Sequence, residues 1–558
     1  MRSLFCIFQN LKFKIVLSLF LSLVCSQVAW SYGGSGKYLV AIQAASKNDF
    51  RHASKNYLSL LKGGISETLI IQEALLFSVL ANDFVSAQKI SMTMENRELK
   101  LPTVGLISLT MLYKNREYHK IENLISHFEK TLPTYLLTLV RGWSDLAQGS
   151  FDNGIMHFAS LSGTSRYLGL YNSALAFAMV GEFQKALSFL EELDEQKVQF
   201  DEIQLQVIAQ IYSNNNLNQK AIEIIEAHED MRKIDTFESI LVSLEKDQKL
   251  QFNVIESPGD ALANIFYLMG SSGDKTVNKS LSAMFYIQLA EFLATDKDYY
   301  TIKLARIFAD LDAFDYSIAK LESVRPGSAF FLKAQLGIAD SLVRSKESSA
   351  AQTVLENLIE KGYDNFVVFD SLADIFRTNE NYEKAINYYN TALKNLPEAV
   401  RSSKWTTFFV RGISYDQMGN WAKAKVDLKI ALELSANHPE VLNYFGYSLI
   451  ERKESLESAL EMIENAVSQR PESGYIVDSL AWGLFRLGLY KEAVVPMERA
   501  IQLEPHDPIV NDHLGDVLWM IGRKREAMFQ WQRALFFGPT VENEKKIRKK
   551  LKFGITDL

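Results

Sequence analysis

The chain has 558 residues, of which 47% are hydrophobic and 23% are charged, and its formal net charge is −7. This length exceeds what one hydrophobic core usually supports, so it predicts either several domains or an array that extends in one direction. Gly and Pro are sparse, with 28 and 11 residues, which favours helices, and the acidic balance argues against a nucleic-acid-binding protein.

The first 31 residues have the pattern of a secretory signal peptide. Basic residues precede the apolar run 15–24, and the small residues Ala29 and Ser31 provide a cleavage site. The basic residues are Arg2, Lys12 and Lys14. The apolar run is shorter than the roughly 20 residues that cross a membrane. We therefore expect an exported protein.

Both cysteines, Cys6 and Cys25, lie inside this segment, so the mature chain would contain none. A chain without thiols suits an oxidising compartment. Cys25 leaves a second interpretation open, a lipoprotein that is cleaved before Cys25 and anchored through it to the outer membrane. The bulky Val24 stands where such sites have a small residue, which favours an unmodified cysteine.

Small residues recur at a nearly constant spacing along the chain. The clearest series is Ala385, Ala424, Ala459, Ala493 and Ala527, at intervals of 39, 35, 34 and 34 residues. Seven residues after each comes another alanine, and four residues after each comes a large side chain. The same register continues towards the N-terminus through Ala351, Ser317, Ala283, Ala221, Ala186, Gly154, Ile121, Ala87 and Ala53. This spacing predicts fourteen helix–turn–helix units that stack in one direction, with a small residue where the two helices cross.

The register breaks once, between Ala221 and Ala283, where the step is 62 residues. We place an irregular connector there. The predicted segments are a signal peptide over 1–31, an N-terminal array over 32–225, the connector over 226–258, a C-terminal array over 259–539, and a basic tail over 540–558. We expect the tail to form a polar helix that caps the stack.

The repeating unit resembles the tetratricopeptide repeat (TPR) family, whose fold is an all-α superhelical solenoid. The stretch 440–540 is also similar to the large exported TPR proteins of Gram-negative bacteria, through LNYFGYS at 442–448, GYIVDSLAWG at 474–483 and NDHLGD at 511–516. Their relatives include an outer-membrane lipoprotein adaptor that partners a carboxy-terminal processing protease in the periplasm. The resemblance implies a periplasmic scaffold or adaptor for other proteins or peptides, such as an envelope protease or a peptidoglycan hydrolase with its substrates. Membrane association would come through a partner or a lipid.

Motifs of known chemistry are missing from the sequence. None of the eight histidines forms a His-Glu-x-x-His pattern, and there is no Gly-x-Ser-x-Gly elbow. The glycine-rich run 33–37 lacks the first glycine of a phosphate loop and is followed by Tyr38, so it favours a flexible linker. We therefore predict a protein that is not an enzyme and that uses no cofactor and no metal. The alternative left open is an enzyme whose site lies in the irregular region 226–280.

In the TPR family, the fifth and ninth positions of each first helix line the concave surface. The resemblance assigns these positions, with two aromatics one turn further on, to an acidic and aromatic partner-binding groove. The predicted groove residues are Asn443, Tyr447, Asp478, Trp482, Phe485, Asp512, Asp516 and Trp519. The alternative for Trp482 and Trp519 is that they pack between neighbouring helices.

Overall fold

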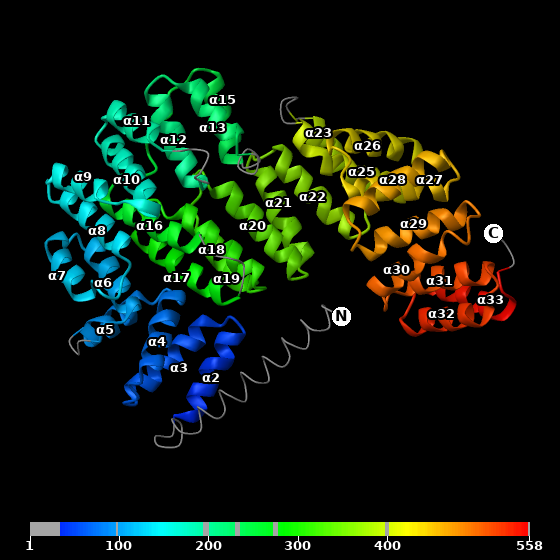
Figure 1. Ribbon diagram of the computed structural model, residues 1–558, viewed down its shortest axis with the longest axis horizontal. Coiled ribbons are helices and arrows are strands. Elements are labelled where there is room, and N and C mark those ends of the chain that lie inside the picture. Colours follow the sequence, from blue (N-terminus) through cyan, green and yellow to red (C-terminus); the bar gives the residue numbers. More distant parts are fainter. Residues whose placement is uncertain are drawn as a thin grey trace. The chain divides into compact units, whose positions relative to one another are not determined.

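The computed structural model describes residues 34–95, 99–193, 200–228, 235–271, 277–394, 396 and 401–555. These residues form 30 α-helices and no strand (Figure 1). The predicted signal peptide, with Cys25, lies outside the described residues. Within the described residues, every helix is too short or too polar to cross a membrane.

The contacts divide the chain into two units, Met1–Ala350 and Ala351–Leu558. The first unit contains α2 (Ser35–Ser46), α3 (Phe50–Lys62), α4 (Thr68–Leu80), α5 (Phe84–Glu95), α6 (Pro102–Lys114), α7 (Ile121–Phe128), α8 (Thr134–Ala147), α9 (Phe151–Ala159), α10 (Arg166–Met179), α11 (Phe183–Glu191), α12 (Glu202–Asn214), α13 (Asn218–Glu226), α15 (Asp235–Glu245), α16 (Pro258–Ser271), α17 (Val277–Leu293), α18 (Asp298–Asp310), α19 (Phe314–Leu321) and α20 (Phe331–Arg344). The division falls inside α21 (Ser348–Glu360). The second unit continues with α22 (Phe366–Thr378), α23 (Tyr382–Lys394), α25 (Trp405–Gln417), α26 (Trp421–Leu434), α27 (Pro439–Glu451), α28 (Leu456–Gln469), α29 (Gly474–Arg486), α30 (Val494–Leu503), α31 (Pro508–Met520), α32 (Lys524–Phe536) and α33 (Val541–Phe553).

Consecutive helices pack as antiparallel pairs, and the predicted crossing residues lie where the two helices of a pair meet. Thirteen of the fourteen crossing positions are buried, and Ala283 is half-buried. At the crossing of α27 with α28, a Cβ atom on Gly446 would lie 2.7 Å from the carbonyl oxygen of Ala459. Only a residue without a side chain permits this approach. The prediction of an all-α solenoid of stacked helix pairs is confirmed.

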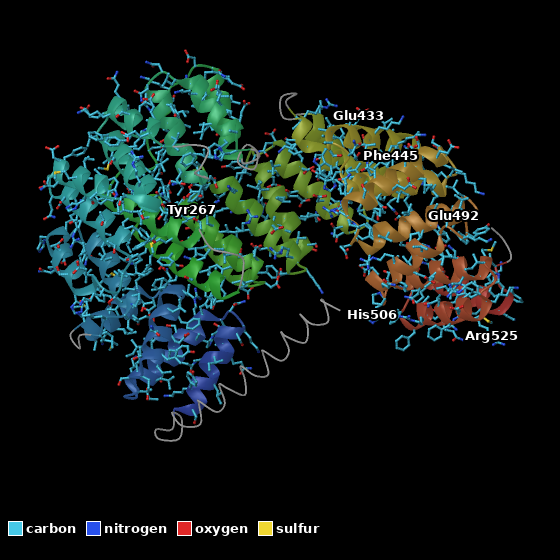
Figure 2. All side chains as sticks on the ribbon, in the orientation of Figure 1. Tyr267, Glu433, Phe445, Glu492, His506 and Arg525 are labelled. Atoms are coloured by element: carbon cyan, nitrogen blue, oxygen red, sulfur yellow. The ribbon has the colours of Figure 1, made fainter. Side chains whose placement is uncertain are left out.

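Large side chains fill the space beside each crossing. In the second unit, Phe445 of α27 is 2% exposed and packs in a cluster with Leu428 and Ile463, and Figure 2 shows it among the helices of this unit. Neither helix of a pair could bury such residues alone, because each helix carries only one apolar stripe. Stacking of the pairs is therefore what forms a continuous core.

The first unit turns back on itself. The first helix of each of three pairs, α4, α6 and α8, contacts α16 or α17, which come more than a hundred residues later. Phe50 packs against Phe308, with ring centroids 5.8 Å apart, and the Tyr316 hydroxyl donates to Asp49 over 2.9 Å. The inner face of the N-terminal helix pairs is therefore covered by helices of the same chain, which lie in the middle of this unit in Figure 1.

The predicted connector, 226–258, holds one helix without a described partner helix of its own. This helix, α15, contacts α13 and precedes the pair α16–α17. The described residues 246–257 that follow it contain no helix. The 62-residue step in the register thus corresponds to a helix inserted between two complete pairs.

Candidate functional site: the first-helix face of the second unit

Three neighbouring first helices of the second unit, α27, α29 and α31, contact one another directly. We call the surface that they form the first-helix face. Two of these helices begin with Pro at their first turn, Pro439 and Pro508, which fits the start of a helix because its missing N–H needs no partner there. In α31 the Asp507 carboxylate also accepts the N–H groups of Ile509 and Val510. These starts set the register that places positions four residues apart on one side of each helix.

Trp482 of α29 lies at the centre of the first-helix face. Its ring stacks on His513 of α31, with centroids 3.9 Å apart and planes inclined by 13°. Its indole N–H donates to Glu451 of α27 over 2.7 Å, and Arg486 reaches the same carboxylate oxygen over 2.9 Å. One aromatic residue therefore links three neighbouring helices, while its ring stays half-exposed.

Asp478 and His513 form a buried pair beneath this ring. The His513 Nδ1 lies 3.0 Å from a carboxylate oxygen of Asp478, and the two residues are 8% and 7% exposed. Burial opposes a charged imidazole, but the Asp478 carboxylate outweighs it and raises the pKa of His513 above its usual value. The face thus carries a histidine whose protonated form is favoured by an acid on the next helix.

Tyr447 lies half-buried on α27, on the same side as Asn443 and Glu451. Burial raises the pKa of its hydroxyl, and the carboxylates of Glu451 and Asp478 raise it further. Tyr447 is therefore a neutral hydrogen-bond donor at physiological pH. One turn earlier, the buried side-chain oxygen of Asn443 has no hydrogen-bond partner among the described residues. An unpaired buried acceptor is costly, and this oxygen lies beneath the surface of the face.

The capping helix α33 covers the end of the first-helix face. Lys550 of α33 donates to Asp512 over 2.8 Å and to Asp516 over 2.7 Å. Burial raises the pKa of Asp516 to about 6, although Lys550 opposes the shift. Trp519 packs against Trp531, with centroids 5.2 Å apart, and the chain passes close to its ring at Gly554. These three sequence-predicted residues therefore lie in the contact with the cap.

The sequence-predicted groove residues thus separate into three groups. Asn443, Tyr447, Asp478 and Trp482 come together on α27 and α29. Phe485 is 2% exposed and belongs to the core, because it lies three positions after Trp482 and stacks under that ring at 4.8 Å. Asp512, Asp516 and Trp519 are engaged by α33 and its C-terminal residues. For Trp519, this is the packing alternative that we had left open.

Three residues of the first-helix face were missed from the sequence, Glu451, Arg486 and His513. Counted from the helix starts, Glu451 and Arg486 are thirteenth residues and His513 is a sixth residue, so a rule that selects fifth and ninth positions does not include them. The motif NDHLGD contains His513 directly after the acid Asp512 and before Leu514, and this was the sequence signal for it. Contacts between side chains 31 to 35 residues apart, on neighbouring first helices, cannot be predicted from spacing alone. They depend on how each helix is rotated about its own axis.

A second acidic cluster lies on α22, at the other end of the unit. Asp374 accepts from Arg377 over 3.2 Å and from the Tyr389 hydroxyl over 2.5 Å. Asp370, one turn earlier, accepts from Thr407 of α25 over 2.9 Å. Burial raises the pKa of Asp370 to about 6. Carboxylates one turn apart therefore occur on the first helices at both ends of this series, α22 and α31.

The first-helix face combines aromatic and charged side chains. In the part of the chain that the structure describes, no group of three or more His, Cys, Asp or Glu side chains is arranged to hold a metal ion. The groups on the face are aromatic rings, a neutral phenol and paired charges. Such groups recognise extended peptides and protein surfaces.

Comparisons with known proteins identify the repeat. Residues 336–400 match the family model described as "Tetratricopeptide repeat". Over 171 residues the chain is 26% identical to a TPR repeat-containing protein of Pseudomonas aeruginosa, and the match covers 30% of this chain and 28% of that relative. The chain is therefore similar to tetratricopeptide repeat proteins over these stretches, and it spans less than a third of the length of the curated relative that it matches.

The chain also has a partial likeness to solved structures. A chain of the APC/C hetero-tetramer Cut9-Hcn1 has a TM-score of 0.41 at 13% identity, with coverage of 95% of this chain and 98% of that one. A tetratricopeptide repeat protein from Parabacteroides merdae has a TM-score of 0.37 at 17% identity, with coverage of 46% and 97%. Because both scores are below 0.5, the fold assignment rests on the helix pairs and crossings of this chain itself.

Proposed function

We propose that this protein is an exported scaffold of the periplasm that binds other proteins or peptides on the first-helix face of its second unit. In this proposal it brings a cell-envelope processing protease or a peptidoglycan hydrolase together with its substrates. Tetratricopeptide repeats are interaction modules, and repeat scaffolds of this kind are typically non-catalytic. The signal-like segment and the resemblance of 440–540 to exported repeat proteins support the location.

The choice of the second unit follows from what covers the first. In the first unit, α16 and α17 contact the first helices α4, α6 and α8 and occupy the face that would otherwise receive a partner. In the second unit, the first helices α27 and α29 keep Tyr447 and Trp482 half-exposed. A partner therefore has an accessible first-helix face in the second unit.

The observation that carries the proposal is the pair of half-exposed aromatic side chains, Tyr447 and Trp482, on the neighbouring first helices α27 and α29. Tyr and Trp bury large areas at a low entropic cost, which makes them anchors in protein interfaces. The carboxylates of Glu451 and Asp478 next to these anchors already pair with Arg486 and His513, so the aromatic side chains supply the main contact for a partner.

Site-specific photocrosslinking in cells tests this binding surface. A photoreactive phenylalanine replaces Tyr447 on the first-helix face, and in the control it replaces Phe529 of α32, which is 57% exposed. We expect one or a few stoichiometric adducts from position 447 that position 529 does not give. Adducts from position 529 alone, or none from position 447, would contradict the proposal.

Sequencing the N-terminus of the mature protein tests export and anchoring. A start shortly after Ser31 supports a soluble periplasmic scaffold. A blocked start at Cys25 supports the lipoprotein alternative, in which the same scaffold is held at the outer membrane. An intact Met1 would exclude both, because a secreted chain loses its signal peptide.

Measuring envelope enzymes and their substrates tests the more specific role. In a deletion strain, we expect the substrates of at least one processing protease or peptidoglycan hydrolase to accumulate, because enzyme and substrate no longer meet on the scaffold. Complementation with the wild-type gene should restore their turnover. Unchanged substrate levels for all these enzymes would remove the adaptor role and leave the general scaffold function standing.

A further inference from the structure

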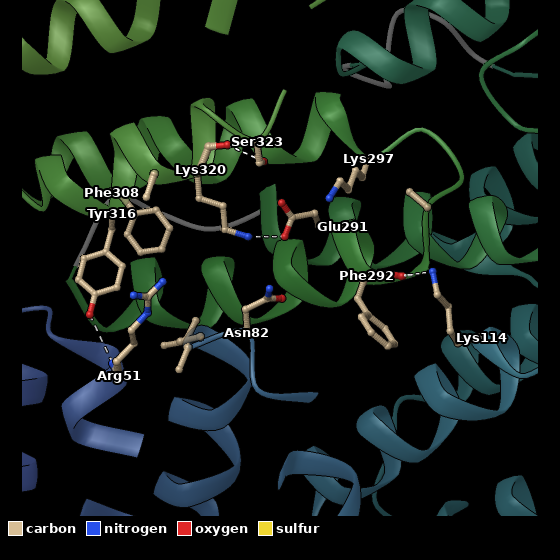
Figure 3. A pocket seen from close by; sticks show the side chains of 14 residues that line it. Arg51, Asn82, Lys114, Glu291, Phe292, Lys297, Phe308, Tyr316, Lys320 and Ser323 are labelled. Carbon is tan, nitrogen blue, oxygen red and sulfur yellow. Dashed lines mark hydrogen bonds and ion pairs between the residues drawn. The ribbon is translucent and has the colours of Figure 1, made fainter. Parts of the chain in front are cut away.

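A cavity of about 400 Å³ lies inside the first unit, apart from the first-helix face (Figure 3). It lies between the C-terminal ends of α4 and α6 on one side and the helices α17, α18 and α19 on the other. Segments that are about 200 residues apart in the sequence therefore enclose it. The size falls in the range of pockets that bind small molecules, about 300–1,000 Å³.

Four cationic side chains line this cavity. They are Arg51, Lys114, Lys297 and Lys320. The one carboxylate among the described lining residues is Glu291. Figure 3 shows Lys320 and Lys297 extending towards Glu291 from opposite sides of the cavity. The lining therefore carries a clear excess of positive charge.

The Glu291 carboxylate is already saturated. One of its oxygens accepts from the Thr301 hydroxyl over 2.6 Å, and the other accepts from Gln288 over 2.5 Å and from Lys320. Glu291 thus balances Lys320 and has little capacity left for another cation. The nearby carboxylate of Asp49 is also engaged, by His52 and by the Tyr316 hydroxyl.

The other three cations have no carboxylate partner within the described residues. Lys114 donates to the carbonyl oxygen of Phe292 over 2.5 Å, and the Arg51 guanidinium lies 5.9 Å from the centroid of the Tyr316 ring. Burial lowers the pKa of Lys114, and Lys297 lowers it further, although Asp260 opposes the shift. The cations that line the cavity repel one another, and a bound anion would reduce this repulsion.

Beside the polar side chains of Asn82, Tyr316 and Ser323, the rest of the lining is apolar. Leu80, Phe292 and Phe308 contribute aliphatic and aromatic surface, with Ala294 and Ala319 between them. Phe292 is fixed by stacking on Phe84 at a centroid distance of 3.9 Å. A ligand that fits must therefore combine a charged head with a compact apolar body.

We propose that this cavity binds a small organic anion, with a carboxylate or phosphate group near Lys114 and Lys297 and an apolar body that extends past Phe292 towards Phe308 and Arg51. The carboxylate and the phosphate share the chemistry that the two lysines recognise, charge with several acceptor oxygens. Binding would neutralise the cluster and join α4 and α6 to α17–α19. The site is independent of the first-helix face and does not rest on the proposed scaffold function.

Displacement of a fluorescent aromatic sulfonate, anilinonaphthalene sulfonate, from the full-length mature protein tests the proposal. Hexanoate and hexyl phosphate serve as competitors for the two head groups, and hexanol serves as the uncharged control. We expect saturable displacement by hexanoate, by hexyl phosphate or by both, which identifies the head group. Displacement by neither anion, or equal displacement by hexanol, would overturn the proposal.

Two variants locate the binding in this cavity. Lys297→Gln removes an exposed cation of the α17–α18 loop, and Lys114→Gln removes the cation beside Phe292. Each should weaken binding of the displacing anion on the order of tenfold, because each removes one charge contact to the head group. The matched control, Lys55→Gln, changes an exposed lysine of α3 outside the cavity and should leave binding unchanged. Equal affinity of all the variants for the anion would overturn the assignment, and circular dichroism confirms that Lys297→Gln is folded.

Discussion

Single residues decide the electrostatics of the first-helix face, and His513 is the clearest case. Its imidazole is held between the ring of Trp482 and the carboxylate of Asp478. The burial of His513 opposes its charge, but the carboxylate prevails and the pKa is raised. The folded second unit therefore binds a proton more tightly than the unfolded chain does.

This raised pKa predicts that the second unit loses stability as the pH rises above 6.5. The stabilisation by protonated His513 is complete below the unfolded pKa of about 6.5 and is lost as the pH passes the higher folded value. We therefore expect the unfolding free energy to fall over this pH range. Urea unfolding between pH 6.5 and 8.5 measures it. The variant His513→Gln should flatten this dependence, and the exposed His506→Gln should keep it; the same slope in all three proteins would contradict the prediction.

At the scale of elements, the close crossing of two helices in each pair is the feature that builds the fold. At Gly446 the nearest obstacle to a side chain is a backbone oxygen of α28 at 2.7 Å, which cannot move without shifting the helix. At Gly412, the equivalent position of α25, the nearest atoms belong to the Leu428 and Asp427 side chains at 3.2–3.3 Å. The two glycines therefore differ in what surrounds them, although they share one place in the repeat.

Gly446→Ala should destabilise the second unit by about 1–3 kcal/mol, because the new methyl group forces α27 and α28 apart. Gly412→Ala should be nearly neutral, since side chains can give by a few tenths of an ångström and alanine favours the helix by about 1 kcal/mol. Chemical denaturation monitored by tryptophan fluorescence compares the two variants. An equal effect of both substitutions would show that the approach to Ala459 does not limit the packing.

At the scale of the whole molecule, the first unit is closed by contacts between distant helices. Glu202 of α12 is 2% exposed and accepts from Lys303 of α18 over 2.6 Å. Lys333 of α20 lies 3.8 Å from its other oxygen. One buried carboxylate thus connects three helices that span about 130 residues of the chain.

Lys303→Met should loosen this closure, because it leaves the buried charge of Glu202 with two longer contacts, to Lys333 and to the Tyr299 hydroxyl. Loss of one partner of a buried ion pair costs on the order of 3 kcal/mol. Hydrogen exchange followed by mass spectrometry should show faster exchange in α12 and α18 and unchanged exchange in α22–α33. The exposed Lys249→Met in the same unit is the control. Faster exchange throughout the chain, or none in α12, would contradict the expectation.

The fold class and the helix crossings could be predicted from the sequence by itself. A small residue about every 34 residues marks the crossing of two helices that are neighbours along the chain. Because such a contact is local in the sequence, it can be predicted from a regular spacing. The segment resembling a signal peptide is likewise a local pattern, and its removal stays a prediction. The break in the register at 221–283 coincides, among the described residues, with the helix α15, and the predicted bounds of the connector stay a prediction.

Only the tertiary structure decided which predicted groove residues lie together on the first-helix face. Asp512, Asp516 and Trp519 contact α33 and the residues after it. Trp482 stacks on His513 and donates a hydrogen bond to Glu451. The return of α16–α19 onto the N-terminal helices, with the cationic cavity that it creates, was equally invisible in the sequence. These features depend on how far each pair rotates relative to the previous one, and small rotations add up over many pairs to contacts that no spacing encodes.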